Sequence, residues 1–249
     1  EDRLDCDPAG ITTTAARAGD GWALTGVKRF VPWAHVAGAL LVPARGAAGP
    51  SLFLVDPTGA GVTLKPVTGM DLTTRWSELR LDGARVGADA LVGGAGGGTA
   101  LFESTLRRAA VCASAEMLGA ARRSLDMAVG YAKVREQFGQ LIGTFQAIRH
   151  KCAEMLMEVE NSHSAVYYAA WALEAGAEDA AIAASICKSY VSESARKVCG
   201  EAIQVHGGIG FTWEYDLHLY FKRAKSLEVQ FGDAEYHREL IARHVSSAS

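Results

Sequence analysis

The spacing of apolar residues changes near residue 100, and this change divides the chain into two predicted parts. Before it, short runs of alternating apolar and polar residues are separated by Gly and Pro, which is typical of strands. After it, apolar residues recur every three or four positions, which is typical of helices packed against a core. We therefore predict an α+β protein, with a β-domain over residues 1–100 and a helical domain over residues 101–249.

The first part is expected to form a small antiparallel β-barrel or sandwich. The segment 11–31 predicts two strands joined by Gly19-Asp20-Gly21, because an Asp-Gly pair favours a hairpin turn. Further strands are expected near residues 39–43, 51–55, 62–66 and 77–81. The glycine-rich run 93–99 lacks the Gly-Lys-Ser/Thr sequence of a phosphate-binding loop, so we interpret it as a flexible joint.

The second part is expected to form an antiparallel helical bundle. Helices are predicted near residues 102–134, 144–174, 178–205, 215–229 and 233–246. Gly176 and the pair Gly207-Gly208 are expected to break the pattern, and His206 is expected to be a loop or interface residue. The aromatic residues Tyr167, Tyr168 and Trp171 are expected to lie either in the bundle core or at a subunit interface.

The segment 134–150 joins the first two predicted helices. Gly139 and Gly143 are expected to end the first helix and turn the chain, and Thr144 is expected to cap the second helix. The segment also carries Arg135, Gln137, Phe138 and Gln146. One interpretation makes the polar side chains solvated and Phe138 a hydrophobic plug, and the other makes the segment a binding site.

Composition excludes several classes of function. A net charge of −3 provides no basic field for nucleic acid. The five cysteines show no C-x-x-C spacing and the seven histidines no metal-ligand spacing, so neither a disulfide framework nor a metal site is expected. No signal peptide and no apolar run long enough for a bilayer is present, and we predict a cytoplasmic protein that does not bind a membrane.

Two motifs resemble the C-terminal half of the flavin-dependent acyl-CoA dehydrogenases. They are R-E-Q-F-G-Q-L-I-G-T-F-Q-A-I at residues 135–148 and Q-V-H-G-G-I-G-F at residues 204–211. Residues 1–100 are similar to that family's middle β-domain. The family has a further helical domain before the β-domain, which the sequence given does not contain. The resemblance implies FAD as the cofactor and an acyl-CoA thioester as the substrate.

The resemblance also assigns residues to the ADP portion of FAD. Arg135 takes the place of the arginine that binds the pyrophosphate, with Gln137 and Phe138 at adjoining contacts and Gln146 near the adenosine. Gln204 takes the place of a glutamine that contacts the ADP moiety. Gly207 and Gly208 match glycines that let the backbone approach the diphosphate. On the flavin side, Phe30-Val31-Pro32 stands where the family has Trp-x-Thr, so an aromatic residue is kept and the hydroxyl is lost.

The catalytic base has no counterpart in this chain. Phe231 and Ala109 stand at the two positions where members of the family carry their catalytic Glu, so the catalytic residue stays unassigned. Glu116 is a weak candidate, since a lone helical Glu is usually solvated or paired with a neighbour such as Arg123. The other carboxylates near these positions are Asp233, Glu228 and Glu103. Asp233 is expected to cap the last helix.

Three functions fit this pattern. The leading hypothesis is a subunit of an acyl-CoA dehydrogenase that contributes the ADP side of the FAD site and an oligomer interface. The resemblance implies that a homologous partner, as in bacterial α2β2 heterotetramers, would supply the base. The alternatives are a self-sufficient homo-oligomeric flavoenzyme with an atypical base, and a flavin-free scaffold or binding protein. The identity of the acyl group is left open.

Overall fold

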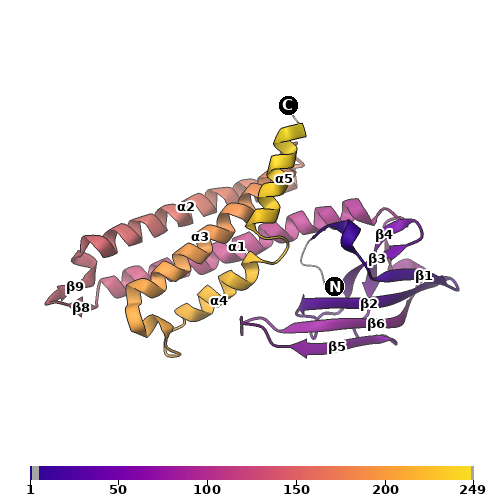
Figure 1. Ribbon diagram of the computed structural model, residues 1–249, viewed down its shortest axis with the longest axis horizontal. Coiled ribbons are helices and arrows are strands. Elements are labelled where there is room, and N and C mark those ends of the chain that lie inside the picture. Colours follow the sequence, from indigo (N-terminus) through magenta and orange to yellow (C-terminus); the bar gives the residue numbers. More distant parts are fainter. Residues whose placement is uncertain (2–5, 248–249) are drawn as a thin grey trace. The chain divides into compact units, whose positions relative to one another are not determined.

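The computed structural model describes residue 1 and residues 6–247, and the chain contains two compact units, Glu1–Leu106 and Arg107–Ser249. The first unit contains a seven-stranded sheet, and the second contains a helical bundle (Figure 1). The predicted α+β class, with the β-domain before the helices, is confirmed.

The strands of the first unit form a single seven-stranded sheet in the order β5-β6-β2-β1-β3-β4-β7. Pairing among the described strands is antiparallel except between β1 and β3, which are parallel through the single pair Thr14 and Arg45. The sheet is therefore mixed, whereas a purely antiparallel one was expected. The strands are β1 (Thr14–Ala18), β2 (Gly21–Pro32), β3 (Leu40–Gly46), β4 (Gly49–Val55), β5 (Val62–Val67), β6 (Trp76–Val86) and β7 (Leu91–Val92).

The predicted hairpin is present, because Ala18 pairs with Gly21 across a turn in which Gly19 has a φ of +66°. Alternation along β2 buries Trp22 and Leu24 on one face of the sheet. Trp22 meets Phe53 of β4 edge-on, with ring centroids 5.4 Å apart. These side chains belong to the core of the first unit.

The glycine-rich run 93–99 is packed against the sheet, so the prediction of a flexible joint was wrong. A Cβ atom on Gly96 would lie 2.3 Å from the carbonyl oxygen of Ala48, and one on Gly98 would lie 2.5 Å from the Cα of Ser51. The Gly96 N–H also donates to Ser51 Oγ at 3.0 Å. Close approach of two backbones, and not flexibility, accounts for glycine at these positions.

The Glu1 carboxylate is held by several donors in the first unit. It accepts hydrogen bonds from the Thr12 and Thr13 N–H groups at 2.9 and 3.0 Å, and from Lys28 Nζ at 2.5 Å. Burial alone would raise the pKa of Glu1, but these bonds outweigh it and lower the pKa from 4.5 to about 2. For Lys28 burial is the larger influence and lowers its pKa, so the pair stabilises the fold by less than the shift of Glu1 alone suggests.

Replacing Glu1 by Gln is expected to lower the free energy of unfolding of the first unit by about 1.5 kcal/mol at pH 7. The native state binds the proton more weakly than the unfolded state. The stabilisation is therefore complete above pH 4.5 and is lost as the pH falls towards 2. Urea denaturation of both proteins between pH 7 and pH 3 measures this, and a difference that stays constant over that range would contradict it.

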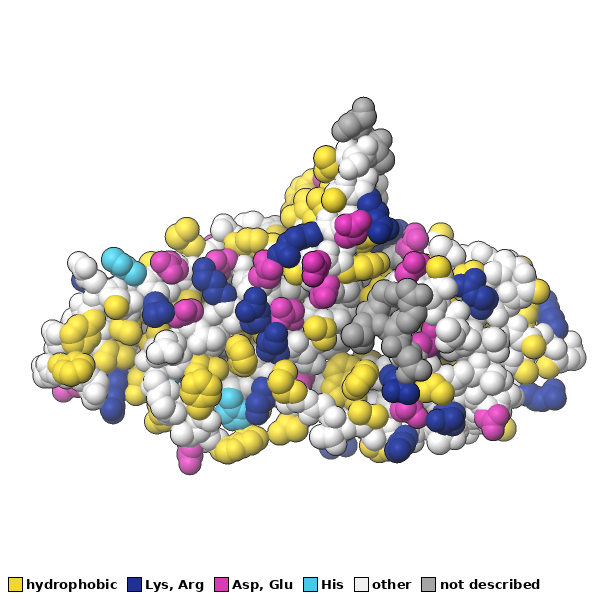
Figure 2. All heavy atoms as spheres, in the orientation of Figure 1, with side chains coloured by type: hydrophobic (Ala, Val, Ile, Leu, Met, Phe, Trp, Pro, Cys, Tyr) yellow, Lys and Arg dark blue, Asp and Glu magenta, His cyan; other side chains and the backbone are white. Residues whose placement is uncertain are grey.

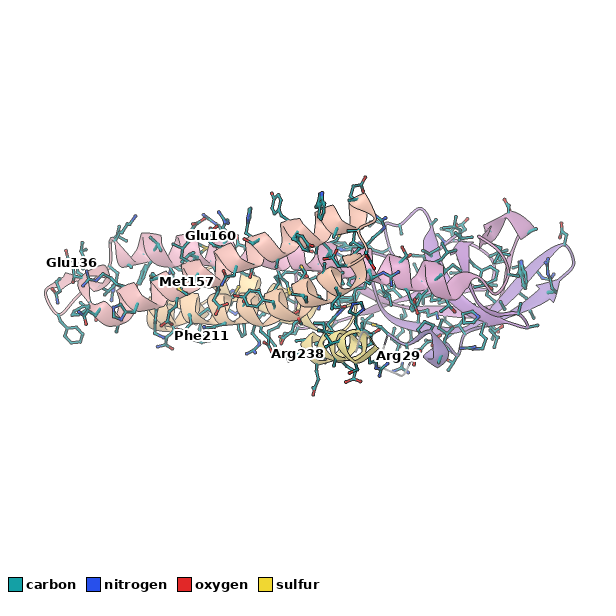
Figure 3. All side chains as sticks on the ribbon, turned by 90° about the horizontal axis from the view of Figure 1, so that it is seen from above. Arg29, Glu136, Met157, Glu160, Phe211 and Arg238 are labelled. Atoms are coloured by element: carbon teal, nitrogen blue, oxygen red, sulfur yellow. The ribbon has the colours of Figure 1, made fainter. Side chains whose placement is uncertain are left out.

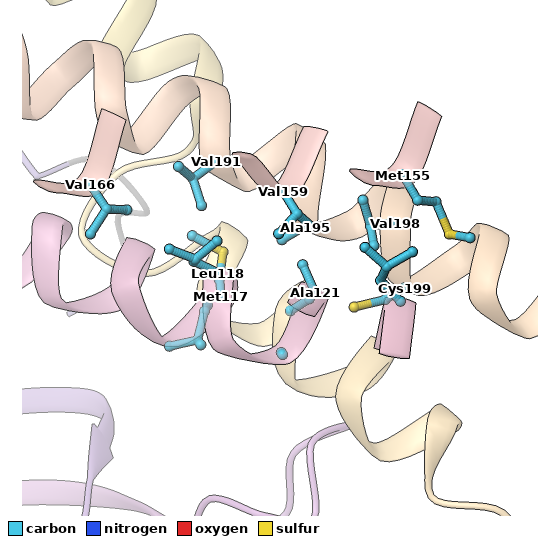
Figure 4. Packing of buried hydrophobic residues seen from close by; sticks show 14 of the residues in the cluster. Met117, Leu118, Ala121, Met155, Val159, Val166, Val191, Ala195, Val198 and Cys199 are labelled. Carbon is cyan, nitrogen blue, oxygen red and sulfur yellow. The ribbon is translucent and has the colours of Figure 1, made fainter. Parts of the chain in front are cut away.

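The second unit is built from five helices whose ends lie within four residues of those predicted. Met117 and Leu118 of α1, Met155 and Val159 of α2, and Val191 of α3 interdigitate in its core (Figure 4). Among the described residues, no helix is long and apolar enough to cross a membrane. The helices are α1 (Gly98–Ala132), which starts in the first unit, α2 (Gln146–Ala175), α3 (Ala180–His206), α4 (Leu217–Glu228) and α5 (Ala234–Ser247).

Charged and apolar side chains are interspersed on the visible face of the bundle (Figure 2). Ion pairs join neighbouring helices of the bundle, among them Lys197 with Glu158 at 2.8 Å and Arg196 with Glu228 at 3.3 Å. On α2, Tyr167, Tyr168 and Trp171 are exposed. They are therefore not part of the bundle core, and their role in a subunit interface stays a prediction.

Candidate functional site

A two-stranded hairpin lies at the end of the bundle where α1 ends and α2 begins (Figure 1). It consists of β8 (Glu136–Gln137) and β9 (Gln140–Leu141), and both turn residues have positive φ angles, +55° for Phe138 and +76° for Gly139. Phe138 is 93% exposed, so the interpretation as a hydrophobic plug was wrong. A bulky residue in the left-handed region costs backbone energy, and here it presents an aromatic ring to solvent.

The polar residues of this segment also face solvent. The backbone N–H of Arg135 donates to the Tyr131 carbonyl at 2.9 Å, while its exposed guanidinium makes no hydrogen bond or ion pair with any residue that the structure describes. Gln137 is also exposed, and its amide donates only to the neighbouring Glu136 carbonyl at 2.8 Å. Figure 3 shows Glu136 at this tip of the bundle. The Arg135 side chain is thus available to an anionic ligand.

The entry into α2 differs from the prediction. Thr144 lies in a short 3-10 helix, η3 (Ile142–Thr144), and its hydroxyl donates back to the Leu141 carbonyl at 2.6 Å. It does not cap α2, which begins at the exposed Gln146 without a side-chain cap. Gly143 is needed for packing, because a Cβ there would lie 2.8 Å from the carbonyl oxygen of Ala132. We call Arg135, Gln137, Phe138 and Gln146 the hairpin group.

The second group of predicted contacts lies at the C-terminal end of α3. Gln204 is exposed on the last turn, and the chain leaves the helix through Gly207, whose φ is +64°. Cβ atoms on Gly207 or Gly208 would meet nothing within 4 Å, so the backbone of both is open to a ligand. The segment continues as a 3-10 helix, η4 (Gly207–Phe211). We call Gln204, Gly207 and Gly208 the α3-end group.

His206 is only 5% exposed, so the expectation of a loop or interface residue was wrong. Its ring stacks on Tyr131 near the end of α1, with centroids 4.4 Å apart. Because Arg135 follows Tyr131 by four residues and Gly207 follows His206 directly, the hairpin group and the α3-end group lie at the same end of the bundle. Burial lowers the pKa of His206, partly offset by its bond to the Ala202 carbonyl.

These two groups suit the ADP portion of FAD. A guanidinium fork and accessible backbone at two glycines are groups that bind a diphosphate. Exposed amide side chains at Gln137, Gln146 and Gln204 add donors and acceptors for an adenosine. The chain's residues therefore fit this part of the cofactor.

Replacing Gly210 by Ala is expected to lower the free energy of unfolding of the helical unit by about 1.5 kcal/mol. Gly210 is buried in η4, and a Cβ there would lie 2.9 Å from the Ile203 carbonyl oxygen and 3.1 Å from the His206 Cβ. Gly208→Ala is the matched control, and a change within about 0.5 kcal/mol is expected for it. Urea denaturation followed by circular dichroism compares the two variants, and equal effects would contradict the packing argument.

The loop between α4 and α5 carries Phe231, at one of the two positions of the missing Glu. Phe231 has a φ of +58° and Gly232 one of +90°. Lys188 of α3 is fully buried, and its Nζ donates to the Glu228 and Gly232 carbonyls, each at 2.8 Å. His237 Nε2 donates to the Phe231 carbonyl at 3.0 Å. The loop is therefore fixed on both sides of a residue that has no acidic group.

Two residues that hold this loop, Lys188 and His237, were not predicted from the sequence. A signal for Lys188 was present, because it lies on the apolar stripe of α3 that includes Ala184, Val191 and Ala195. A lysine at such a position requires acceptors inside the protein. No comparable signal marked His237, since its acceptor is a backbone carbonyl in another segment.

The carboxylates considered as substitutes are already engaged. Glu116 accepts from Arg223 of α4, at 2.6 Å from Nε and 2.5 Å from Nη2, so the expected partner Arg123 was wrong. Glu228 pairs with Lys225 at 2.8 Å. Asp233 accepts the Tyr236 N–H at 2.8 Å and caps α5, as predicted.

Ala109 and Glu103, both on α1, provide no alternative. Ala109, at the second position of the missing Glu, is half-buried and has no acidic group. Glu103 lies in an exposed position on the first turns of α1. Neither Ala109 nor Phe231 thus has an acidic group at the position where the family carries its Glu.

The end of β2 carries the residues that stand in the place of the flavin contacts. Phe30 is 56% exposed with a φ of +53°, and its ring meets Trp76 edge-on with centroids 6.3 Å apart. Trp33, also exposed, has a φ of +58°. Pro32 between them has neither a hydroxyl nor a backbone N–H. This strand end therefore presents aromatic surface but no donor at residue 32.

A groove of about 780 Å³ on α2, α3 and α4 is a weaker candidate site. Its central carboxylate, Glu158, accepts from Ser194 at 2.7 Å, Lys197 at 2.8 Å and Tyr190 at 2.9 Å. The bond from Lys197, with those from Ser194 and Tyr190, lowers the pKa of Glu158. The charged groups of the groove have partners within it or on neighbouring helices, so it offers little to a ligand.

Comparison with known proteins shows which family both units of the chain resemble. Residues 96–246 match the acyl-CoA dehydrogenase C-terminal domain, and residues 1–84 match the acyl-CoA dehydrogenase middle domain. The probable acyl-CoA dehydrogenase FadE25 of Mycobacterium tuberculosis (strain ATCC 25618 / H37Rv) is 32% identical over 95% of this chain and 63% of its own length.

Two solved structures are similar over 98% of this chain. Butyryl-CoA dehydrogenase from Megasphaera elsdenii has a TM-score of 0.93 at 29% identity, with 66% of that chain covered. The ChsE4-ChsE5 complex from Mycobacterium tuberculosis has a TM-score of 0.88 at 31% identity, with 65% of that chain covered. This chain thus spans 63 to 66% of the length of these relatives. The chain belongs to the acyl-CoA dehydrogenase family, and it carries the family's middle and C-terminal domains.

Proposed function

We propose that this chain is a subunit of an FAD-dependent acyl-CoA dehydrogenase, in which it binds the ADP portion of FAD while a homologous partner supplies the catalytic base. The hairpin group and the α3-end group would hold the ADP portion. FAD, when bound, accepts a hydride in the α,β-dehydrogenation of an acyl-CoA thioester. The partner's base would take the proton from the α-carbon.

Individual residues of this chain have distinct roles in the proposal. The Arg135 guanidinium would bind the pyrophosphate through two N–H donors, and the open backbone at Gly207 and Gly208 would let it approach closely. Gln204 and Gln137 would donate to or accept from the ADP moiety, and Phe138 would cover an apolar face of the cofactor. Gln146 would contact the adenosine.

One observation carries the assignment of the base to a partner. Neither Phe231 nor Ala109 has an acidic group, and the loop around Phe231 is fixed by Lys188 and His237. The loop therefore holds at this position a side chain that cannot take a proton. One of the similar solved structures is itself a complex of two differently named chains, ChsE4 and ChsE5, which supports a heteromeric assembly.

The alternative of a self-sufficient enzyme has Glu116 as a weak candidate for its atypical base. The salt bridge to Arg223 favours a structural role for this carboxylate, because breaking it would leave the largely buried guanidinium without this partner. Glu116→Gln is therefore expected to leave the turnover of the assembled enzyme within about two-fold of wild type. A loss of turnover of more than about 100-fold, with folding intact, would favour Glu116 as the base.

The visible spectrum of the purified protein tests the proposal. The chain is produced alone and together with a homologous acyl-CoA dehydrogenase chain that carries Glu at the position of Phe231 or Ala109. Flavin absorbance is expected only in the mixed complex. Bound flavin in the chain alone would contradict the proposal, and absence of flavin from every combination would favour a flavin-free scaffold.

A further inference from the structure

An aromatic cluster joins the hairpin group to the α3-end group. The rings of His206 and Tyr131 are stacked, with planes inclined by 18° and centroids 4.4 Å apart. Tyr215, which follows η4, packs at 5.3 Å from His206 and 6.3 Å from Tyr131. The cluster therefore links the C-terminal ends of α1 and α3. It also brings together His206 and Tyr215, which lie on either side of η4 in the sequence.

Each ring is connected to the backbone beside the predicted FAD contacts. The Tyr131 carbonyl accepts the N–H groups of Val134 and Arg135 at 3.1 and 2.9 Å. His206 is followed directly by Gly207, and its Nδ1 donates to the Ala202 carbonyl at 2.8 Å, which fixes the orientation of the ring. A shift of either ring would therefore move one group of contacts relative to the other.

The surroundings of His206 suit a packing role. Its Nε2 is buried and has no hydrogen-bond partner among the described residues. An apolar side chain would avoid this cost, but only a ring with a donor can both stack on Tyr131 and be held by the Ala202 carbonyl. The combination of stack and oriented N–H is what distinguishes histidine from phenylalanine or leucine at this position.

We propose that His206 is a positioning residue, whose stack on Tyr131 holds Arg135 and the Gly207-Gly208 backbone at a fixed separation for a diphosphate ligand. A ligand bound from two sides gains affinity when both sides are preorganised, because less motion is lost on binding. The identity of the ligand rests on the proposed function. The mechanical link between the two groups is a property of this chain alone.

Hydrogen exchange of the complete chain tests the link without any ligand. In His206→Leu, the amides of residues 133–142 are expected to exchange about ten-fold faster than in wild type. In His206→Phe, which keeps a ring, the increase should stay below about three-fold. His218→Leu is the matched control, since His218 is also buried with an unpartnered Nδ1 but packs on Trp213. Unchanged exchange in His206→Leu, or an equal increase in the control, would overturn the proposal.

Tyr131→Leu gives the reciprocal measurement and decides the matter if His206→Leu does not fold. Tyr131 is only half-buried, so its loss is tolerated more easily. Amides of residues 207–215 are expected to exchange about ten-fold faster in this variant, although none of them is adjacent to residue 131 in sequence. No change in that segment would contradict a link through the stacked rings.

Calorimetry with ADP as the probe then tests the effect on binding. Arg135→Ala and His206→Leu should each weaken ADP binding, and the double variant should lose less than about three-fold beyond Arg135→Ala. Losses that simply multiply would overturn the positioning role. This calorimetry uses the mixed complex, and if the wild-type complex binds no ADP, the proposed function fails, and the exchange experiments alone decide on the link between the two groups.

Discussion

Replacing Lys188 by Met is expected to lower the free energy of unfolding of the helical unit by about 3 kcal/mol. The ammonium group is fully buried, and its three N–H donors reach Ser192 Oγ at 3.2 Å and the Glu228 and Gly232 carbonyls at 2.8 Å. Methionine has a similar length but no donor, so two buried carbonyls would lose their partner. Urea denaturation followed by circular dichroism measures the effect.

Lys197→Met is the matched control on the same helix. Lys197 is half-exposed and pairs with Glu158 at the surface, where an ion pair contributes about 0 to 1 kcal/mol. The two variants should therefore differ by at least about 2 kcal/mol. Similar losses in both would show that Lys188 does not hold the loop around Phe231.

Replacing Arg135 by Ala should weaken FAD binding by the mixed complex about 30-fold, with no loss of stability. A bidentate, charge-assisted contact to a diphosphate contributes about 2 kcal/mol, which corresponds to this factor. Stability should change by less than about 0.5 kcal/mol, because the exposed guanidinium contacts no described residue. Equilibrium titration of the flavin-free complex with FAD, together with thermal denaturation, gives both values.

Two further variants make this result specific. Arg135→Lys keeps the charge without the planar fork and should recover only part of the affinity. Arg149→Ala removes an exposed arginine from the first turn of α2 that the family motif does not assign to the cofactor, and it should bind FAD as wild type does. A loss as large in Arg149→Ala as in Arg135→Ala would mean that net charge, and not a specific contact, attracts the cofactor.

The long elements could be predicted from the sequence because their apolar periodicity persists over many turns. All five helices end within four residues of the predicted positions, and the hairpin at Gly19-Asp20 follows from local turn chemistry. Predictions of short features were wrong where a single specific contact, local or distant, determines the conformation. Ser51 and Ala48 hold the glycine run 93–99, and the Leu141 carbonyl binds the Thr144 hydroxyl.

The candidate site could be predicted only in part, because some of its contacts join residues that are far apart in the sequence. Motifs name Arg135 and Gln204, but the stack of Tyr131 on His206 joins residues 75 positions apart through side chains of unremarkable type. The partner of Glu116 is a similar case, because Arg223 is 107 positions away whereas Arg123 is a neighbour on the same helix. Pairings between distant helices depend on how the helices pack, which periodicity alone does not specify.

The turnover of an acyl-CoA substrate by defined subunit mixtures tests whether a partner chain supplies the catalytic base. The chain is assayed alone and after co-purification with a homologue that carries the catalytic Glu, with an artificial electron acceptor present. The account predicts no turnover for the chain alone, turnover for the mixed complex, and loss of that turnover when the homologue's Glu is replaced by Gln. Turnover by the isolated chain would contradict it.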